Sequence, residues 1–295
     1  MHVNGVMMFS TLAPGAIGIR EIGLEQSIDL ARESGFAGLV FNIREAAALA
    51  DEHGFDHVAS LFSQANVRPG YWSLPVSIRD RDRWQTDVQN LPRFARLGRE
   101  LGCTRLTAIV FPGSDELAFE DNLAWHVERF RPIAEALATE GCRLGIEFIG
   151  PKTFRARFRH EFIYTLGGVM DMATSIGVGN VGVLLDAWHL YTSGGSLADL
   201  DTITADDIVA VHVNDAPAGI SVDEQIDNVR ALPLETGVID LVGFMSKLRQ
   251  LGYDGPVMPE PFSQRIDNLA ATDPLAAARE TAASMDALWR AANLS

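Results

Sequence analysis

Short apolar runs alternate with longer amphipathic segments along the whole chain. Runs of four to eight apolar residues are typical of buried strands, and the longer amphipathic segments are typical of helices. The runs that predict strands are Val6–Leu12, Gly38–Ile43, Arg68–Leu74, Arg105–Phe111, Arg143–Ile149, Val181–Asp186, Ile208–Val213 and Pro256–Glu260.

Helices are predicted between these strands, many of them ending at a glycine, as helices often do. They are Leu24–Gly35, Ala46–Ala65, Asp82–Gly102, Glu116–Gly141, Ile163–Gly177, Leu241–Gly252 and Pro274–Ala292, with a weaker segment at Leu197–Leu200. We expect Gly54 to break the second helix, Pro92 to split or kink the third and Pro132 to bend the fourth.

Strands that alternate with helices favour parallel pairing, because each crossover needs a helix. Eight such units over 295 residues fit a single-domain α/β protein, a (β/α)8 TIM barrel spanning residues 1–295, better than an open sheet. No glycine-rich linker marks a domain boundary. No G-x-G-x-x-G motif follows the first strand, which argues against a dinucleotide-binding sheet.

The net charge of −15 argues against nucleic acid as a partner, because binding it needs a basic surface. Cys103 and Cys142 lie far apart and are expected to be free thiols in a reducing compartment. The N-terminus has no charged region followed by a long apolar core, so no signal peptide is predicted. With no membrane-length apolar stretch either, we expect no membrane partner and a cytoplasmic location.

Four polar side chains sit near the ends of the last four predicted strands: Glu147, Asp186, His212 and Glu260. Taken singly, each has an ordinary explanation, such as a buried salt bridge for an acid or a satisfied core histidine. Four separate buried polar groups would each need a partner of their own. Each group left unpaired would destabilise the fold by several kcal/mol. In a parallel barrel they would meet at one mouth, where a single cation could satisfy all of them.

Three carboxylates and one imidazole suit a divalent cation. This ligand set favours Mn²⁺, with Mg²⁺ and Co²⁺ as alternatives, over the Cys- and His-rich shells that are common for zinc, although Zn²⁺ stays open. The sequence therefore predicts a metal-dependent enzyme.

The order Glu147, Asp186-x-x-His189, His212 and Glu260 resembles the xylose isomerase-like TIM-barrel superfamily of sugar isomerases and epimerases. The segment H-V-N-D-A-P, followed by Arg230 and L-E-T-G-V-I-D-L, resembles the inosose isomerase and dehydratase branch. The similarity covers essentially the whole chain. Pro233-Leu234-Glu235-Thr236-Gly237 departs from the usual turn of that branch, which leaves the substrate open.

The resemblance implies roles for individual residues. The four predicted ligands would hold the metal, and Glu147 and Glu260 would also move protons. His189 would contact a substrate oxygen and Arg230 would lie near the substrate. Further substrate contacts are expected from Lys152 and His160, in the basic segment 150–161. Aromatic residues near strand ends are expected as apolar walls of the site: Phe9, Phe41, Trp72, Phe111 and Trp188.

These features predict an isomerase or epimerase that acts on a sugar or cyclitol through an enediolate, by proton transfer next to a carbonyl. A lyase acting on a keto-sugar or inosose at the same site is the alternative, because elimination shares the first step. The basic segment and the long loop 214–236 would both leave the active-site face of the barrel. Related barrels are often dimers or tetramers, so a homo-oligomer is compatible with the resemblance.

Two functions from other classes are less compatible with the sequence or need a separate test. The related endonucleases that act at abasic DNA sites share this barrel, but they need two or three metals and many more histidines. The seven histidines of this chain are too few, and its charge of −15 does not suit DNA. A non-catalytic sugar-binding barrel is distinguished by Glu147→Gln, which abolishes turnover only in an enzyme.

Overall fold

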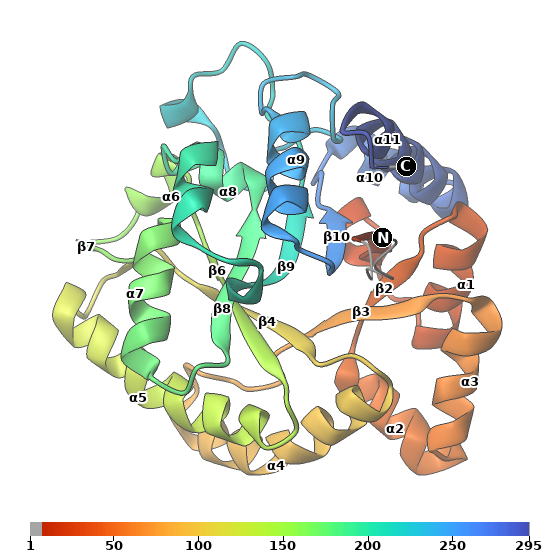
Figure 1. Cartoon of the computed structure of the whole chain (residues 1–295), viewed down its shortest axis with the longest axis horizontal. Helices are drawn as coiled ribbons and strands as arrows, with labels where there is room; N and C mark the ends of the chain where they lie inside the picture. Colours follow the sequence, from red (N-terminus) through yellow and green to blue (C-terminus); the bar gives the residue numbers. More distant parts are fainter. Residues whose placement is uncertain (1–7, 295) are drawn as a thin grey trace.

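Eight parallel strands close into a barrel in the computed structural model, which describes residues 8–294 (Figure 1). Each strand pairs with the next along the chain, and β10 returns to β1 to close the cylinder. The predicted single-domain (β/α)8 barrel is confirmed. The strands are β1 (Phe9–Leu12), β2 (Gly38–Phe41), β3 (Arg68–Ser73), β4 (Arg105–Val110), β6 (Arg143–Phe148), β8 (Val181–Asp186), β9 (Ile208–Val213) and β10 (Pro256–Pro259). The first two residues of the predicted strand Val6–Leu12 lie outside the described residues.

A second, two-stranded sheet lies outside the barrel. Its strands β5 (Gly113–Ser114) and β7 (His160–Glu161) pair antiparallel and connect the loops that follow β4 and β6. The sequence did not predict this pair, because two-residue strands carry no periodicity.

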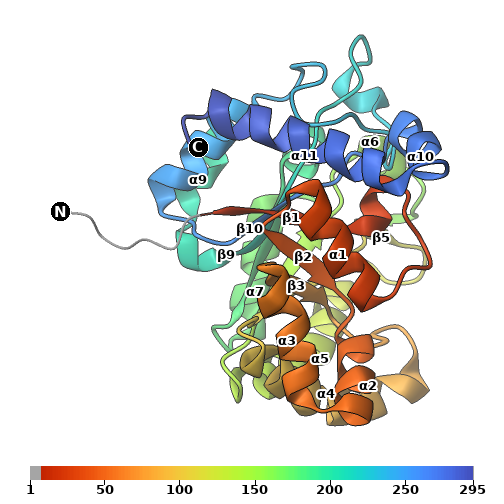
Figure 2. The ribbon, with the colours of Figure 1, turned by 90° about the vertical axis from the view of Figure 1, so that its right-hand side faces the viewer.

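Helices surround the barrel (Figure 1), and α11 packs beside α1 at the seam where the cylinder closes (Figure 2). The helices are α1 (Leu24–Ser34), α2 (Ile43–His53), α3 (Phe55–Ala65), α4 (Arg81–Glu100), α5 (Phe119–Ala138), α6 (Lys152–Arg155), α7 (Leu166–Ile176), α8 (Ala187–Thr192), α9 (Leu241–Leu251), α10 (Gln264–Ala270) and α11 (Pro274–Ala291). Short 3-10 turns occupy Pro14–Ile17, Leu197–Thr202, Ala205–Asp207 and Val222–Glu224. Within residues 8–294, none of the helices is both long and apolar enough to cross a membrane.

Local side-chain bonds explain most differences from the predicted helix bounds. Asn42 caps α2 through the amides of Arg44 and Glu45, so the helix begins three residues before the predicted Ala46. The Ser114 hydroxyl accepts the amides of residues 116 and 117, which keeps them out of α5. Gly54 does separate α2 from α3, with φ of 89°.

The two internal prolines do not divide their helices. Pro92 lies inside α4 and Pro132 inside α5, and each helix is one element of 20 residues. A proline removes only one backbone hydrogen bond, and both helices pack a buried face on the barrel. The expected split at Pro92 is therefore wrong.

The main core lies between the strands and the surrounding helices, where Leu106, Leu144 and Val183 meet side chains such as Phe130 and Met172. Each such side chain contributes roughly 1.5–3 kcal/mol when fully buried. A smaller cluster lies inside the cylinder and forms a floor beneath the carboxyl ends of the strands: Ala16, Tyr71, Leu184, Ala210 and Met258.

Candidate metal centre

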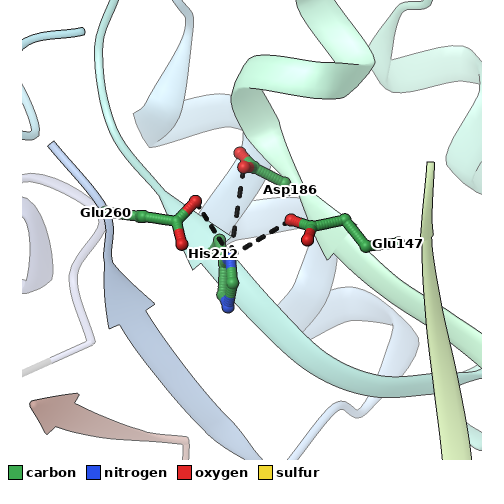
Figure 3. A group of neighbouring side chains, drawn as sticks. All are labelled: Glu147, Asp186, His212 and Glu260. Carbon is green, nitrogen blue, oxygen red and sulfur yellow. Dashed lines mark ion pairs between the residues drawn. The ribbon is translucent and has the colours of Figure 1, made fainter. Parts of the chain in front are cut away.

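Glu147, Asp186, His212 and Glu260 converge at the carboxyl ends of four neighbouring strands (Figure 3). Each offers one ligand atom, and these atoms all lie within 4.8 Å of one another. His212 Nδ1 lies 3.3 Å from Glu147 Oε1 and 3.4 Å from Glu260 Oε2. The structure thus brings the four predicted ligand residues together at one rim.

Strand register sets this convergence. Asp186 and His212 are partners in the ladder between β8 and β9, so they lie at the same height. Glu260 follows β10 directly and donates its amide to the carbonyl of Val213, which continues the ladder by one residue. Parallel strands direct their carboxyl ends to one face of a barrel, so four strand-end residues meet there.

Burial and mutual repulsion shape the charge of the site. Burial raises the pKa of Glu147 to about 7; the charge of His212 opposes this rise, while Glu260 and Asp186 add to it. Burial would also lower the pKa of His212, but Tyr71 and the surrounding carboxylates raise it well above its ordinary value. The pocket therefore attracts positive charge strongly.

Arg230 supplies part of that charge. Its Nη1 donates to Asp186 Oδ2 at 2.9 Å and to Glu260 Oε2 at 2.8 Å, and its Nη2 donates to Asp227. Burial would raise the pKa of Asp186, but Arg230, His189 and His212 outweigh burial and lower it. With all three carboxylates ionised, Arg230 and a protonated His212 still leave one negative charge uncompensated among these residues.

The residues fit a divalent cation by two observations. Glu147 Oε1 and His212 Nδ1 are buried and have no hydrogen-bond partner within the described chain, although they face each other across the site. Three carboxylate oxygens and one imidazole nitrogen are donors suited to divalent cations. Buried polar atoms are nearly always satisfied, so the two orphaned atoms match the place of a ligand.

Two side chains that sequence reasoning missed support the four. The Tyr71 hydroxyl lies 2.6 Å from His212 Nε2, the nitrogen that points away from the carboxylates. Asn214 donates to Asp186 Oδ1, which also accepts the amide of Trp188 and so caps α8. Asn214 lies two residues after His212. Because side chains alternate between the two faces of a strand, the sequence could have indicated that both point inward.

His189 faces the same site from α8. Its Nδ1 accepts the amide of Gly150 at 3.2 Å, and its Nε2 lies 3.2 Å from Arg230 Nη2, so both ring nitrogens face N–H donors. Nε2 lies 3.9 Å from Glu147 Oε1 and 3.8 Å from Asp186 Oδ2. Burial lowers the pKa of His189 to about 4, so the ring is neutral at pH 7.

None of the five predicted substrate contacts lines the cavity: His189 and Arg230 lie against the converging carboxylates, and the other three lie farther out. Lys152 is exposed and pairs with Asp223 on a neighbouring loop. His160 belongs to β7, in the small outer sheet. Trp188 is fully buried below Arg230, whose guanidinium lies 5.3 Å from its ring centre, and it does not line the cavity.

A cavity of about 800 Å³ opens above Glu147, His212 and Glu260. Of the five aromatic residues expected in its walls, Phe41 and Phe111 line it, whereas Phe9, Trp72 and Trp188 do not. Trp72 points outward and donates to the Cys103 carbonyl, because its neighbour Tyr71 takes the inward position on β3. Successive strand residues face opposite sides, so only one of the two can enter the barrel.

The curated proteins that are similar in sequence to this chain include enzymes of several kinds. Inosose isomerase of Halalkalibacterium halodurans is 22% identical, over 78% of this chain and 79% of that protein. Ketose 3-epimerase of Arthrobacter globiformis is 24% identical, over 83% and 79%. 3-Dehydroshikimate dehydratase of Pseudomonas putida is 28% identical over 62% of this chain, but that match spans only 27% of the dehydratase.

Solved structures share the whole architecture. A xylose isomerase domain protein from Alicyclobacillus acidocaldarius has a TM-score of 0.86 at 29% identity, over 97% of this chain and 99% of that one. The IOLI protein, solved with a binding zinc atom, has a TM-score of 0.74 at 18% identity, over 95% and 98%, which is evidence for the fold alone. The family model described as xylose isomerase-like TIM barrel matches residues 22–288. The chain belongs to the xylose isomerase-like TIM-barrel family.

Proposed function

We propose that this protein is a divalent-metal-dependent isomerase or epimerase of a sugar or cyclitol that carries a carbonyl group. The observation that carries this proposal is the convergence of four ligand atoms within 4.8 Å at the base of an open cavity. Relatives that are isomerases, epimerases and dehydratases support an enzyme that acts on a small molecule.

Glu147 and Glu260 are the proposed proton-transfer groups. Their carboxylates come from different strands and both line the cavity, and epimerisation requires them to act on opposite faces of one substrate carbon. Burial raises the pKa of Glu147 to about 7 in the cation-free site, and a bound cation would favour the ionised carboxylate that removes a proton. Removal of the proton next to the carbonyl by one carboxylate gives an enediolate, and return by the other gives the epimer. Return at the neighbouring carbon gives the isomer.

Glu147, Asp186, His212 and Glu260 are proposed to hold the cation, with Mn²⁺ favoured by the oxygen-rich set and Mg²⁺, Co²⁺ and Zn²⁺ as alternatives. When bound, the cation supplies Lewis acidity that acidifies the carbon next to the carbonyl. His189, which lies beside Glu147 and Asp186, is the proposed contact to a substrate oxygen. Arg230 donates hydrogen bonds to both Asp186 and Glu260, and its positive charge limits the repulsion between the two carboxylates.

The proposal is tested by proton exchange. The Mn²⁺-loaded protein is incubated in deuterated water with a panel of ketoses and keto-cyclitols, and label incorporation is followed by NMR. We expect incorporation at the carbon next to the carbonyl, lost by at least about 100-fold in Glu147→Gln. Glu120→Gln, which changes an exposed acid of α5, is the matched control and keeps the wild-type rate. Absence of metal-dependent label across the panel contradicts the proposal.

A lyase is the second candidate, because dehydratases are among the relatives. In that reaction the same proton removal is followed by loss of a β-hydroxyl group as water. Mass spectrometry separates the two outcomes, since elimination lowers the substrate mass by about 18 Da and epimerisation leaves it unchanged.

A further inference from the structure

The cavity above the metal centre has an apolar wall on the side of β4. Ile109 is 55% exposed and Phe111 is 37% exposed, although both line the cavity. Trp125 and Phe130 of α5 extend this wall, and Val76 and Ile78 border it from the loop between β3 and α4. A wall of this kind matches the flat face of a ring better than the hydroxyl groups of an open-chain polyol.

Two arginines line the same cavity, and only one of them has an acidic partner. Arg44 lies 3.3 Å from Asp87 and also donates to the carbonyl of Pro75. The Arg79 guanidinium stacks over Phe111, 4.2 Å from the ring centre. No carboxylate of residues 8–294 lies within ion-pair distance of Arg79, and burial is the one cause that lowers its pKa.

Nothing else in the cavity neutralises Arg79. Within the described chain, the acids that line the cavity are Glu147 and Glu260, and both belong to the metal centre. His126 also lines the cavity, but burial lowers its pKa to about 4, so it is neutral at pH 7. Arg79 is exposed, as is Arg81 two residues away, but Arg79 lines the cavity and stacks on its aromatic wall, so its unpaired charge faces the space a ligand would fill.

The loop that carries Arg79 is held in place from both sides. Asp87 accepts the amide of Ser77 at 2.8 Å, and Asp80 caps α4 through the amides of Asp82 and Arg83. Because Asp80 already occupies these two amides, they are not available to a ligand. The unpaired donors on this loop are the N–H groups of the Arg79 guanidinium, which form a planar fork. A fork of this shape matches a carboxylate, whereas a phosphate is usually held by several donors.

We propose that Arg79 binds a carboxylate of the substrate, while the ring of that substrate lies along Ile109 and Phe111. The substrate class is then a carboxylated keto-ring compound and not a neutral sugar or cyclitol. This inference rests on the proposed function, which it narrows.

The test compares two ligands that differ only in charge. Shikimate has a flat ring with hydroxyl groups and one carboxylate, and methyl shikimate is its neutral ester. Calorimetry on the Mn²⁺-loaded full chain is expected to give at least about tenfold tighter binding of shikimate, the range of one charge-assisted hydrogen bond. In Arg79→Gln this preference falls to within about twofold, and Arg79→Lys retains part of it.

Arg81→Gln is the matched control, because Arg81 is an exposed arginine two residues away that does not line the cavity. It loses the same charge and is expected to keep the preference. Equal binding of acid and ester, no measurable binding of either at millimolar concentration, or the same loss in Arg81→Gln overturns the inference. Deuterium exchange on neutral ketoses is measured in parallel: if it proceeds while the preference is absent, the proposed function stands and the carboxylate subsite fails.

Discussion

At the scale of single residues, Tyr71 has the clearest consequence. Its hydroxyl lies 2.6 Å from His212 Nε2, and both side chains are buried. If Nδ1 gives its lone pair to a cation, the ring hydrogen is on Nε2 and is donated to the Tyr71 oxygen. Histidine ligands are commonly oriented by such a partner on the far nitrogen. Tyr71 is therefore a positioning residue for His212.

Tyr71→Phe is expected to weaken Mn²⁺ binding by about tenfold, because the ring of His212 loses its orienting partner. The dissociation constant is measured by titration calorimetry on the purified apo-protein, so the readout does not depend on turnover. Tyr253→Phe is the control: it removes another buried phenol hydroxyl, which donates to the Pro256 carbonyl at the base of β10. Equal loss of metal affinity in both variants would contradict the positioning role.

At the scale of elements, the loop between β9 and α9 is organised by one buried carboxylate. Asp215 accepts the backbone amides of residues 236, 237, 238 and 239, at 2.7–3.1 Å. Its own backbone exchanges two hydrogen bonds with Ala231, the residue after Arg230. Asp215 thus closes the long loop and fixes the point from which Arg230 enters the metal centre.

Asp215→Asn is expected to lower the free energy of unfolding by about 2–4 kcal/mol, because an amide offers one acceptor oxygen and leaves buried N–H groups unpaired. Urea denaturation followed by circular dichroism measures the change. Asp223→Asn alters an exposed acid of the same loop, paired with Lys152, and is expected to change stability by less than about 0.5 kcal/mol. Similar losses in the two variants would show that Asp215 does not organise the loop.

The elements also show how far sequence reasoning reaches. The strands and the convergence of Glu147, Asp186, His212 and Glu260 could be predicted, because apolar runs mark buried strands and parallel strands share one active face. Tyr71 could not be told from Trp72, since both are aromatic and only the register of β3 decides which points inward. The predicted start of α5 is wrong because the Ser114 hydroxyl accepts backbone amides that would otherwise belong to the first turn of the helix.

At the scale of the whole molecule, the candidate metal centre draws on the second half of the barrel as one unit. Four adjacent strands, β6, β8, β9 and β10, each contribute one of the converging side chains. A cation that binds only the folded chain stabilises it by mass action, because the unfolded chain separates residues that lie up to 113 positions apart, from 147 to 260. Loss of the cation restores the repulsion among the three carboxylates.

Metal removal is therefore expected to lower the melting temperature. A cation at 100 times its dissociation constant adds about 2.7 kcal/mol to the free energy of unfolding, which corresponds to a few degrees for a chain of this length. Calorimetry with Mn²⁺ and with excess EDTA measures the difference. Divalent ions also screen the net charge of −15, so Asp186→Asn serves to separate the two effects. The substitution replaces one of the four converging ligand groups by an amide, but it changes the net charge of the protein by only one. If Mn²⁺ raises the melting temperature of this variant as much as that of the wild type, the stabilisation comes from general screening and not from the site.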